Sequence, residues 1–440
     1  MKNLLIIAYY FPPSGGPGVQ RVLKHVKYLR EFGWKPHVLT VSNGEFPARD
    51  ESLLKEIPDD IILERTRIYE PYDIYRLLTG KKKGTAIDVN VIKKEEQKIG
   101  FKEKIAEFIR ATFFIPDARI GWLPTARRAV KDMVDKYKID AVYSSSPPYT
   151  CSLIARYAKR KFKLPWVAGF RDPWTGFIST PKRWFLPAAI DRHLEKSVFS
   201  ESDYVECAWE GIIKDALSKY PDLDRTKFKH IPNGFDSADY PEIEKERNER
   251  FTLTYTGSMY GRRNPASLFA AIELLLNEGK IEADKILLRF IGRFGNEVQE
   301  MFDSASFRDS IEIIGYIPHK ESIKYLMLSD LLLLVVDESK ESEEIVPGKV
   351  YEYIGTKIPV LAIAPKRSAI AELMNETKAG AVAHQSEIEK IAEIFLRFYS
   401  DWLSGESSYT PDTAVINSYE RREAAKQLAG LLNQLTENEQ

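Results

Sequence analysis

The segment from Glu344 to Glu352 brings together several side chains that could bind a phosphorylated ligand. Pro347 suits the first turn of a helix, and Gly348 and Lys349 follow it, so this helix would present free N–H groups and a lysine to an anion. Glu352 is ionised at neutral pH and could accept two hydrogen bonds from a vicinal diol such as that of a ribose. Glu344 lies eight residues earlier, close to where a sugar could sit. An acidic pair at this spacing is common by chance, so its context must decide.

A second segment, residues 257–265, has the composition of a phosphate-binding turn. After an apolar β-type run it places the small residues Gly257 and Ser258, and then Arg262 and Arg263. Guanidinium groups bind phosphate oxygens through two parallel hydrogen bonds, so the pair suits a diphosphate. An arginine pair that is simply exposed on the surface explains the same pattern. Taken alone, the segment therefore favours the surface interpretation.

A glycine-containing loop, Phe11–Gly18, also follows the first apolar run, and a helical pattern begins at about Val19. Gly15 and Gly16 would let the backbone approach a ligand closely, and the helix N-terminus would add free N–H groups. The loop lacks the G-x-G-x-x-G pattern and two prolines precede it, so we do not expect a dinucleotide site. A tight strand-to-helix turn explains the glycines equally well.

These loops need a scaffold, and the hydrophobic pattern predicts one made of parallel strands. Short apolar runs alternate with helical patterns, as in βαβ units, and the runs are apolar on both faces, as in a sheet covered by helices on both sides. The predicted strands of the first half are Asn3–Tyr9, His37–Val41, Ala141–Ser144, Trp166–Gly169, Tyr204–Cys207 and Lys229–Ile231. Those of the second half are Phe251–Thr256, Ile286–Ile291, Ile311–Ile314, Leu331–Val336, Val360–Ile363 and Gly380–Ala383.

The two series of strands predict an α/β protein with two doubly wound, Rossmann-like domains that face each other across a cleft. We expect an N-terminal domain at 1–236 and a C-terminal domain at 251–412, joined by the charge-dense linker 237–250. The remaining residues, 413–440, are predicted to form a helix that packs back on the first domain. Ligands of such sheets bind outside the carboxyl ends of the strands, so the cleft is the expected site.

Composition excludes several classes of protein. The 64 basic and 64 acidic side chains give zero net charge, whereas a nucleic-acid binder normally has a basic excess. The two cysteines, Cys151 and Cys207, are too few for a disulfide scaffold and too far apart for a metal clip. The densest apolar run, Leu331–Val336, is far shorter than the roughly 20 residues of a spanning helix, and the N-terminus lacks a signal-peptide cleavage site. We expect a cytoplasmic protein.

An insertion predicted at about 76–115 departs from this neutrality. Residues 81–110 carry nine Lys/Arg against five Asp/Glu, and 102–114 has apolar residues near helical spacing. A helix packed on its domain with a solvated charged face explains the pattern. The alternative is a peripheral contact of residues 81–114 with the inner face of a membrane, since basic charge beside aromatic residues suits an anionic interface.

Five blocks of the sequence together resemble the nucleotide-sugar-dependent glycosyltransferases of the two-domain GT-B fold, in particular glycosyltransferase family 4. They are FPPSGGPGVQRVLKHVKYLREFGW at 11–34, GFRDPWTG at 169–176, HIPNGFD at 230–236, YTGSMYGRRNP at 255–265 and EIVPGKVYEYIGTKIPVLAI at 344–363. The blocks follow the family's order, and the likeness spans nearly the whole chain. The most specific pair is HIPNGFD and the later E-x7-E segment.

The resemblance implies that the N-terminal domain binds an acceptor and the C-terminal domain binds a nucleotide-sugar donor. It assigns contact with the donor sugar to Glu344 and with the ribose to Glu352, and it places Asp172 near the reacting centre, so Asp172 and Glu344 are the predicted catalytic residues. The predicted donor-binding residues are Gly257, Ser258, Arg262, Arg263, Tyr316, Ile317, Pro347, Gly348, Lys349 and Glu352. The predicted acceptor or phosphate loop comprises Gly15, Gly16 and Arg171.

The sequence departs from the family pattern in two places. Ser258 stands where many members have arginine, which leaves Arg262, Arg263 or Lys349 to supply the charge. Further glutamates crowd the loop before Glu344, so the residue that fills the first-glutamate role stays open. They are Glu338, Glu341 and Glu343.

The resemblance further implies sugar transfer with retention of configuration, without a metal or cofactor, to a glycan or lipid-linked acceptor in cell-surface polysaccharide synthesis. Cations and N–H groups aimed at the departing phosphate would lower the barrier. The acidic triplet Asp222-Leu223-Asp224 lies in a polar connection, and we interpret it as surface. The alternatives are a sugar-nucleotide epimerase of the same fold and a non-catalytic nucleotide-sugar-binding protein.

Overall fold

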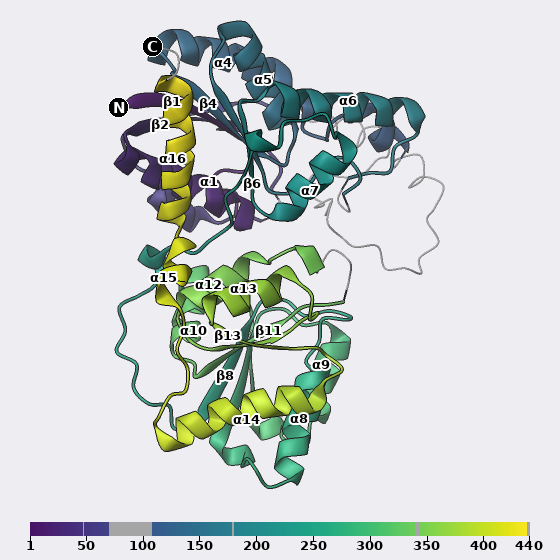
Figure 1. Cartoon of the computed structure of the whole chain (residues 1–440), viewed down its shortest axis with the longest axis vertical. Coiled ribbons are helices and arrows are strands. Elements are labelled where there is room, and N and C mark those ends of the chain that lie inside the picture. The colour runs from purple at the N-terminus through teal and green to yellow at the C-terminus, as the bar shows by residue number, and fades with distance from the viewer. Residues whose placement is uncertain (47, 70–107, 178–179, 339–342, 438–440) are drawn as a thin grey trace. The chain divides into compact units, whose positions relative to one another are not determined.

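The computed structural model describes residues 1–46, 48–69, 108–177, 180–338 and 343–437, which form two compact units (Figure 1). The first unit comprises Met1–Pro232 together with Arg421–Gln440, and the second comprises Asn233–Glu420. The chain thus passes from one unit to the other after Pro232 and returns after Glu420. The segment 237–250, predicted as a linker, lies inside the second unit, and the predicted final segment 413–440 is divided between the two.

The first unit is built on a seven-stranded sheet in which all neighbouring strands are parallel. Its strands are β1 (Lys2–Ala8), β2 (Trp34–Val41), β3 (Ile62–Thr66), β4 (Ala141–Ser146), β5 (Trp166–Phe170), β6 (Tyr204–Cys207) and β7 (Phe228–His230), in the order β3-β2-β1-β4-β5-β6-β7. The sequence analysis predicted all of these except β3. That strand lies at the sheet edge and none of its residues is fully buried, so it has no apolar run to reveal it.

Helices cover both faces of this sheet, which explains why β1 is apolar on both sides. Leu5 and Ile7 belong to one core cluster, with side chains of α4 and α5, whereas Leu4 and Ile6 belong to another, with side chains of α1 and α16. The helices are α1 (Pro17–Tyr28), α4 (Leu123–Tyr137), α5 (Thr150–Phe162), α6 (Phe185–Glu201), α7 (Glu210–Lys219) and α16 (Arg421–Glu437). The C-terminal helix α16 therefore lies beside α1, far from it in sequence (Figure 1).

The second unit repeats the same plan with a six-stranded parallel sheet. Its strands are β8 (Phe251–Thr256), β9 (Ile286–Ile291), β10 (Ile311–Ile314), β11 (Leu331–Val335), β12 (Val360–Ile363) and β13 (Gly380–Ala383), in the order β10-β9-β8-β11-β12-β13. Its helices are α8 (Ala266–Asn277), α9 (Asn296–Ser304), α10 (His319–Met327), α12 (Gly348–Gly355), α13 (Ala369–Thr377), α14 (Ile388–Ser404) and α15 (Thr413–Ser418). All six predicted strands are confirmed.

The strand order of each sheet identifies the position where ligands of doubly wound sheets bind. β1 lies between β2 and β4, and β8 lies between β9 and β11, so the direction of strand addition reverses at β1 and at β8. Ligands of doubly wound sheets bind outside the carboxyl ends of the strands at this reversal. The expected positions are therefore the loops after β1 and β4 in the first unit and after β8 and β11 in the second. The α/β, doubly wound fold class is confirmed.

Most of the predicted basic insertion, 76–115, lies outside the described residues. The part that the structure describes begins at residue 108, and residues 108–113 are helical. Among the helices in the described ranges, none combines the length and the apolar composition that crossing a membrane requires.

A buried ion pair connects α1 to β6, close to Pro232, where the chain leaves the first unit. The Arg21 guanidinium donates a hydrogen bond to the Glu206 carboxylate, and both side chains are almost fully buried. Arg21 also donates to the carbonyl oxygens of Ile231, at 2.7 Å, and Pro232, at 3.0 Å. The Tyr143 hydroxyl donates to the second oxygen of Glu206 at 2.6 Å. These contacts join α1, β4, β6 and the end of the first pass through this unit.

Burial alone would raise the pKa of Glu206, but the positive charge of Arg21 and the hydrogen bonds to the carboxylate outweigh it and lower the pKa to about 2. A carboxylate whose pKa is depressed stabilises the fold above its unfolded-state pKa, and this stabilisation is lost as the pH falls through the folded-state pKa. The contribution of Glu206 is therefore present at neutral pH and disappears as the pH falls from about 4.5 to about 2.

We expect Glu206→Ala to lower the free energy of unfolding by about 3–5 kcal/mol, because it leaves the buried guanidinium of Arg21 without its counter-charge. The matched control is Glu201→Ala, which removes an ion pair with Arg160 whose guanidinium is largely exposed, and which should cost at most about 1 kcal/mol. Urea unfolding followed by tryptophan fluorescence measures both. Equal losses in the two variants would contradict the anchoring role of Glu206.

Candidate functional site

The turn after β8 is built around Gly257. Its φ of +119° lies in a region that residues with a side chain rarely adopt, and its N–H donates to the carbonyl of Ile291 at 2.8 Å. Ser258 follows on the exposed surface, and its carbonyl accepts a hydrogen bond from the Tyr255 hydroxyl at 3.0 Å. The backbone at the end of β8 is therefore fixed by hydrogen bonds while Gly257 and Ser258 stay accessible.

Lys349, in the first turn of α12, reaches back to this turn. Its Nζ donates to the carbonyl oxygen of Thr256 at 3.2 Å and lies 4.0 Å from the centre of the Tyr255 ring. A Cβ placed on Gly257 would lie 3.4 Å from the same nitrogen. The structure thus brings Gly257 and Lys349, 92 positions apart in the sequence, into contact at the reversal point of the second sheet.

Lys349 and Arg263 form a cationic pair that the protein neutralises incompletely. Burial and, to a smaller extent, the charge of Arg263 lower the pKa of Lys349, Glu352 partly opposes them, and the resulting pKa is about 7. Arg263 Nη2 lies 3.6 Å from a carboxylate oxygen of Asp337, just after β11. Within the described residues its Nε is buried and has no hydrogen-bond partner. Buried donors without a partner are costly, so this arrangement favours an incoming anion.

The amino end of α12 adds backbone donors beside these cations. Pro347 occupies the cap position with φ −60° and ψ 140°, one residue earlier than the predicted first helical turn, and the helix begins at Gly348. In the part of the chain that the structure describes, no side chain caps this end and its first turn holds no acid. The N–H of Val350 donates to the carbonyl of Pro347 at 3.0 Å, so among the described residues the N–H groups of Gly348 and Lys349 are the ones that can bind an anion.

Glu352 lies one turn further along α12. Its Oε1 is 2.8 Å from Nε2 of His319, the first residue of α10, and its backbone oxygen accepts a hydrogen bond from the Tyr240 hydroxyl at 2.8 Å. A carboxylate held through one oxygen can still accept a bond from a ligand through the other. His319 was missed by the sequence analysis, because a single histidine at a helix start gives no signal until the sheet order places its loop near α12.

The predicted pair Tyr316 and Ile317 lies in the loop between β10 and α10. Tyr316 is largely exposed, and the Arg293 guanidinium lies 5.5 Å from the centre of its ring. Arg262, the other predicted arginine of the β8–α8 loop, is exposed. These residues therefore lie on loops that leave the same edge of the second sheet, the carboxyl edge, as Gly257 and Arg263 do.

The glutamates after β11, which were candidates for contact with the donor sugar, differ in their surroundings. Glu338 is paired with Nε2 of His384, whereas Glu343 and Glu344 are exposed. Glu341 lies outside the described residues. Glu344 lies after β11, the strand next to β8, as the donor-sugar role requires. Among the described residues, however, the contacts that join Arg263, Lys349 and Glu352 do not include it.

In the first unit, Arg171 joins the loops that follow three strands. Its guanidinium donates to the carbonyl oxygen of Pro147, just after β4, and, at 3.3 Å from Nε, to that of Ser146, the last residue of β4. A Cβ placed on Gly18 would lie 1.6 Å from Nη1 of Arg171, so a side chain at position 18 would displace the guanidinium. The requirement for glycine at position 18 was not recognised from the sequence, since it depends on Arg171 approaching from a distant loop.

The predicted glycine loop is fixed from its other side. Gly15 donates its N–H to the carbonyl of Ala48 at 3.0 Å, and Gly16, with φ +104°, caps α1. Ser14 is fully buried, and its hydroxyl oxygen has no hydrogen-bond partner among the described residues. The loop therefore contains a buried hydroxyl without a hydrogen-bond partner, and within the described ranges no side chain caps the helix that follows it.

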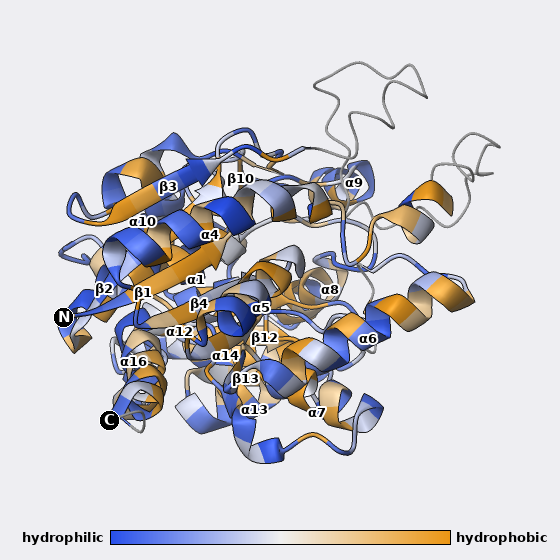
Figure 2. Ribbon diagram, turned by 90° about the horizontal axis from the view of Figure 1, so that it is seen from above, coloured by the Kyte–Doolittle hydropathy of each residue, from blue (hydrophilic) through white to orange (hydrophobic). Residues whose placement is uncertain are grey.

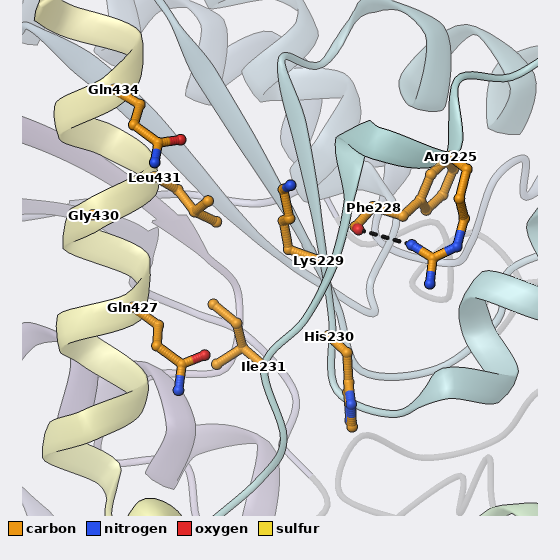
Figure 3. Close-up of a pocket in the computed structure, with 9 residues that line it drawn as sticks. All are labelled: Arg225, Phe228, Lys229, His230, Ile231, Gln427, Gly430, Leu431 and Gln434. Carbon is orange, nitrogen blue, oxygen red and sulfur yellow. Dashed lines mark hydrogen bonds between the residues drawn. The ribbon is translucent and has the colours of Figure 1, made fainter.

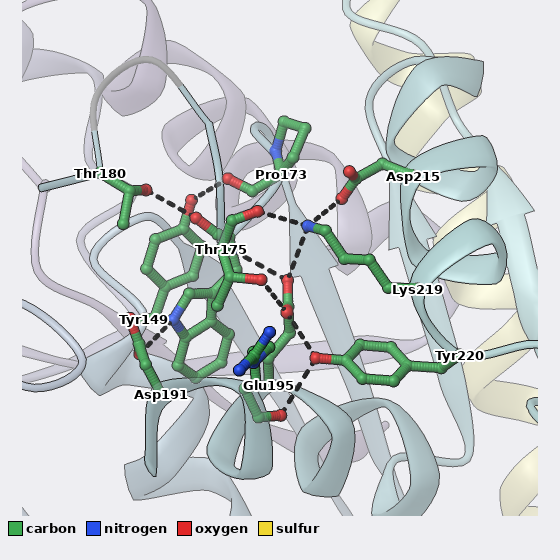
Figure 4. Close-up of polar contacts among 11 residues, drawn as sticks. Tyr149, Pro173, Thr175, Thr180, Asp191, Glu195, Asp215, Lys219 and Tyr220 are labelled. Atoms are coloured by element: carbon green, nitrogen blue, oxygen red, sulfur yellow. Dashed lines mark hydrogen bonds and ion pairs between the residues drawn. The ribbon is translucent and has the colours of Figure 1, made fainter. Parts of the chain in front are cut away.

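Asp172 follows Arg171 on a loop whose shape depends on two buried carboxylates of α6 (Figure 4). Asp191 accepts a hydrogen bond from Trp174 Nε1 at 2.9 Å, and Glu195 accepts one from the N–H of Thr175 at 3.0 Å. Burial raises the pKa of Asp172 itself, and the charge of Arg171 partly opposes this effect. The spacing of four between Asp191 and Glu195 is the one signal that could have identified them from the sequence, because it places both on one helix face.

A pocket of about 370 Å³ lies elsewhere in the first unit, between β7 and α16 (Figure 3). Arg225, Lys229 and His230 line it from one side and Gln427 and Gln434 from the other. None of the predicted site residues lines this pocket. We interpret it as the place where α16 covers the edge of the sheet incompletely.

Curated relatives with significant similarity match only part of the chain. Two tRNA modification GTPases named MnmE, from Thermoanaerobacter sp. strain X514 and Thermoanaerobacter pseudethanolicus, are 31% identical over 128 residues, and the match covers 27% of this chain and 27% of each relative. The chain thus spans about a quarter of their length. Its sequence has no G-x-x-x-x-G-K-S/T loop, the phosphate-binding signature of P-loop nucleotidases, so no GTPase activity follows from this match.

Solved structures match the fold over almost the whole chain. A glycosyltransferase from Rickettsia africae has a TM-score of 0.62 at 14% identity, with 99% of both chains covered. The Anabaena protein HepE in complex with UDP has a TM-score of 0.58 at 13% identity, with 99% of this chain and 100% of that chain covered. Sucrose-phosphate synthase from Thermosynechococcus elongatus has a TM-score of 0.58 at 12% identity and full coverage of both chains.

Two family models match successive parts of the sequence. The model of Glycosyltransferase Family 4 matches residues 87–239, and the model of Glycosyl transferases group 1 matches residues 236–412. The second match contains the whole cluster around Gly257, Arg263, Lys349 and Glu352. The chain is therefore a glycosyltransferase of the GT-B fold that resembles glycosyltransferase family 4.

Proposed function

We propose that the chain transfers a sugar from a nucleoside-diphosphate sugar to a glycan or lipid-linked acceptor, in the synthesis of a cell-surface polysaccharide. The observation that carries the proposal is the cationic pair Arg263 and Lys349, which lies beside the Gly257 turn and the amino end of α12. The HepE structures hold UDP in one case and UDP with glucose in another, which supports a nucleotide-sugar donor.

The contacts in the second unit suggest a place for each part of the donor. The diphosphate would lie between Gly257, Arg263, Lys349 and the first-turn N–H groups of α12, which together supply positive charge and hydrogen-bond donors. The ribose diol would bind the Glu352 carboxylate, which His319 holds in place. The base would lie near the loop at Tyr316 and Ile317, and the sugar near Glu344.

Cleavage of the bond between the anomeric carbon and the diphosphate oxygen leaves negative charge on the departing phosphate. Lys349, Arg263 and the α12 amides stabilise this charge as it develops, which is the largest effect that a preorganised site offers. We propose that no metal or cofactor takes part, since these groups supply the charge. The acceptor hydroxyl would bind near Arg171 and Asp172 of the first unit, and the configuration of the sugar would be retained.

The test is an assay of nucleoside diphosphate release from UDP-, GDP- and ADP-sugars, with and without candidate glycan and lipid-linked acceptors and in the presence of EDTA. A glycosyltransferase releases the diphosphate only when the acceptor is present, and we expect EDTA to leave the rate unchanged. An epimerase would convert the donor without release. A non-catalytic binding protein would bind the donor and do neither.

We expect Arg263→Ala and Glu352→Ala each to weaken binding of the donor by about 10- to 100-fold, because each removes a charged hydrogen-bonding group worth about 1.5–3 kcal/mol. Isothermal titration calorimetry measures the affinity, and thermal unfolding checks the fold. Arg397→Ala is the matched control, since it removes an exposed arginine from α14. Unchanged affinity in both site variants would disprove the assignment of this donor site.

The affinity for a nucleotide sugar should also depend on pH through Lys349. Because the pKa of this lysine is about 7 and the diphosphate binds its protonated form, the affinity should fall as the pH rises, by about tenfold between pH 6 and pH 8. Lys349→Arg keeps the charge at every pH in this range and should flatten the profile. An unchanged pH dependence in the arginine variant would show that another group titrates.

A further inference from the structure

Large hydrophobic side chains are exposed together in one region of the first unit. Six of the twelve exposed large hydrophobic residues within the described ranges lie on the helical residues 108–113 and at the start of α6. We call these six residues the apolar face: Phe108, Phe113, Trp184, Phe185, Leu186 and Ile190. Phe185 is 79% exposed and Phe113 is 69% exposed. A contiguous exposed apolar patch on a folded protein marks an interaction site.

The two segments of the apolar face are held side by side by hydrogen bonds. Trp184 Nε1 donates to Thr112 Oγ1 at 2.9 Å. The Arg183 guanidinium donates to the carbonyl oxygens of Ala111, at 2.7 Å, and Phe114, at 2.9 Å. In Figure 2 the helical segment after residue 107 and the outer end of α6 both carry hydrophobic stretches. The two segments that carry the apolar face are therefore joined, although they are far apart in sequence.

The contact that joins these segments is buried, which makes the face a fixed part of the fold. Arg183 forms an ion pair with Asp191 at 2.7 Å, and their side chains are 3% and 2% exposed. Asp191 also accepts the hydrogen bond from Trp174. The buried pair therefore anchors the start of α6, which carries Trp184, Phe185 and Leu186, to the rest of the unit.

The exposed charged side chains next to the apolar face in the sequence are basic. Lys182 and Arg192 are exposed and Arg110 is partly exposed. The acids of the same segments point inward, since Asp191 pairs with Arg183 and Asp117 accepts hydrogen bonds inside the unit. Aromatic rings fringed by cations complement the boundary between the acyl chains and the anionic headgroups of a bilayer.

We propose that the apolar face docks the first unit on an anionic membrane surface. Trp184, Phe185 and Phe113 insert at the level of the headgroups, and Lys182 and Arg192 bind lipid phosphates. Docking itself does not depend on sugar transfer. Its consequence, that a lipid-linked acceptor is met at the membrane surface, rests on the proposed function.

The test compares binding of the full chain to vesicles of phosphatidylcholine alone and to vesicles that also contain phosphatidylglycerol, measured by co-sedimentation. We expect binding to the anionic vesicles, and at least a tenfold loss in the triple variant Phe113→Ser/Phe185→Ser/Leu186→Ser. The matched control, Leu54→Ser/Leu403→Ser, removes two exposed leucines elsewhere on the chain and should bind as the unmodified protein does. Lys182→Glu/Arg192→Glu should bind the anionic vesicles more weakly.

Circular dichroism and thermal unfolding establish that the variants are folded. We expect the triple variant to bind the donor normally in calorimetry, so a loss of vesicle binding can be told apart from a failure of the proposed function. Retained vesicle binding by the folded triple variant, or no binding by the unmodified chain, would overturn the proposal. Self-association of the unmodified chain in light scattering, abolished in the triple variant and without vesicle binding, would overturn it in favour of a second copy of the chain.

Discussion

The second unit holds an ammonium group that is partly withdrawn from water at the end of β8. Lys349 Nζ rests against the carbonyl of Thr256 and the ring of Tyr255, neither of which is an anion. Withdrawing an ammonium from water without a bound carboxylate costs free energy, and the lowered pKa of Lys349 reports that cost. A diphosphate placed at Gly257 would supply the missing counter-charge. The free energy lost on folding would thus be recovered when the donor binds.

This arrangement depends on the topology of the sheet. Gly257 directly follows β8, and Lys349 lies in the first turn of α12, which comes after β11 in the sequence. The two strands are neighbours because the direction of strand addition reverses at β8. Glycine is favoured at position 257 because its backbone lies at φ +119°, and a Cβ there would be in van der Waals contact with the lysine. The first unit uses the same construction, in which Gly18 makes room for the guanidinium of Arg171. In each unit a glycine after the first strand accommodates a cation from a distant loop.

Sequence patterns identified the elements that have a strong periodic signal and failed where contacts decide. The strands of the second unit were predicted correctly because apolar residues recur along each of them, although β10 and β13 are only partly buried. β3 has a glutamate and an arginine among its five residues and was missed. The glycines and cations of the site were predicted, since local composition and the family pattern mark them. His319, Asp191 and Glu195 were not, because each acquires its partner only through the tertiary fold. A lone histidine and two helix acids look like surface residues until the sheet order is known.

The buried network on α6 connects two regions of the first unit that the sequence treats as separate. Trp174, on the loop that carries Arg171 and Asp172, donates to Asp191, and Asp191 pairs with Arg183. Arg183 in turn fixes the segment that carries Phe113 through backbone carbonyls. Every link in this series is a charged or hydrogen-bonded contact with little exposure to water, so breaking one link leaves a buried group unsatisfied. The same buried aspartate thus fixes both the loop proposed to receive the acceptor and the face proposed to meet the membrane. A substitution at Asp191 would therefore disturb both regions at once.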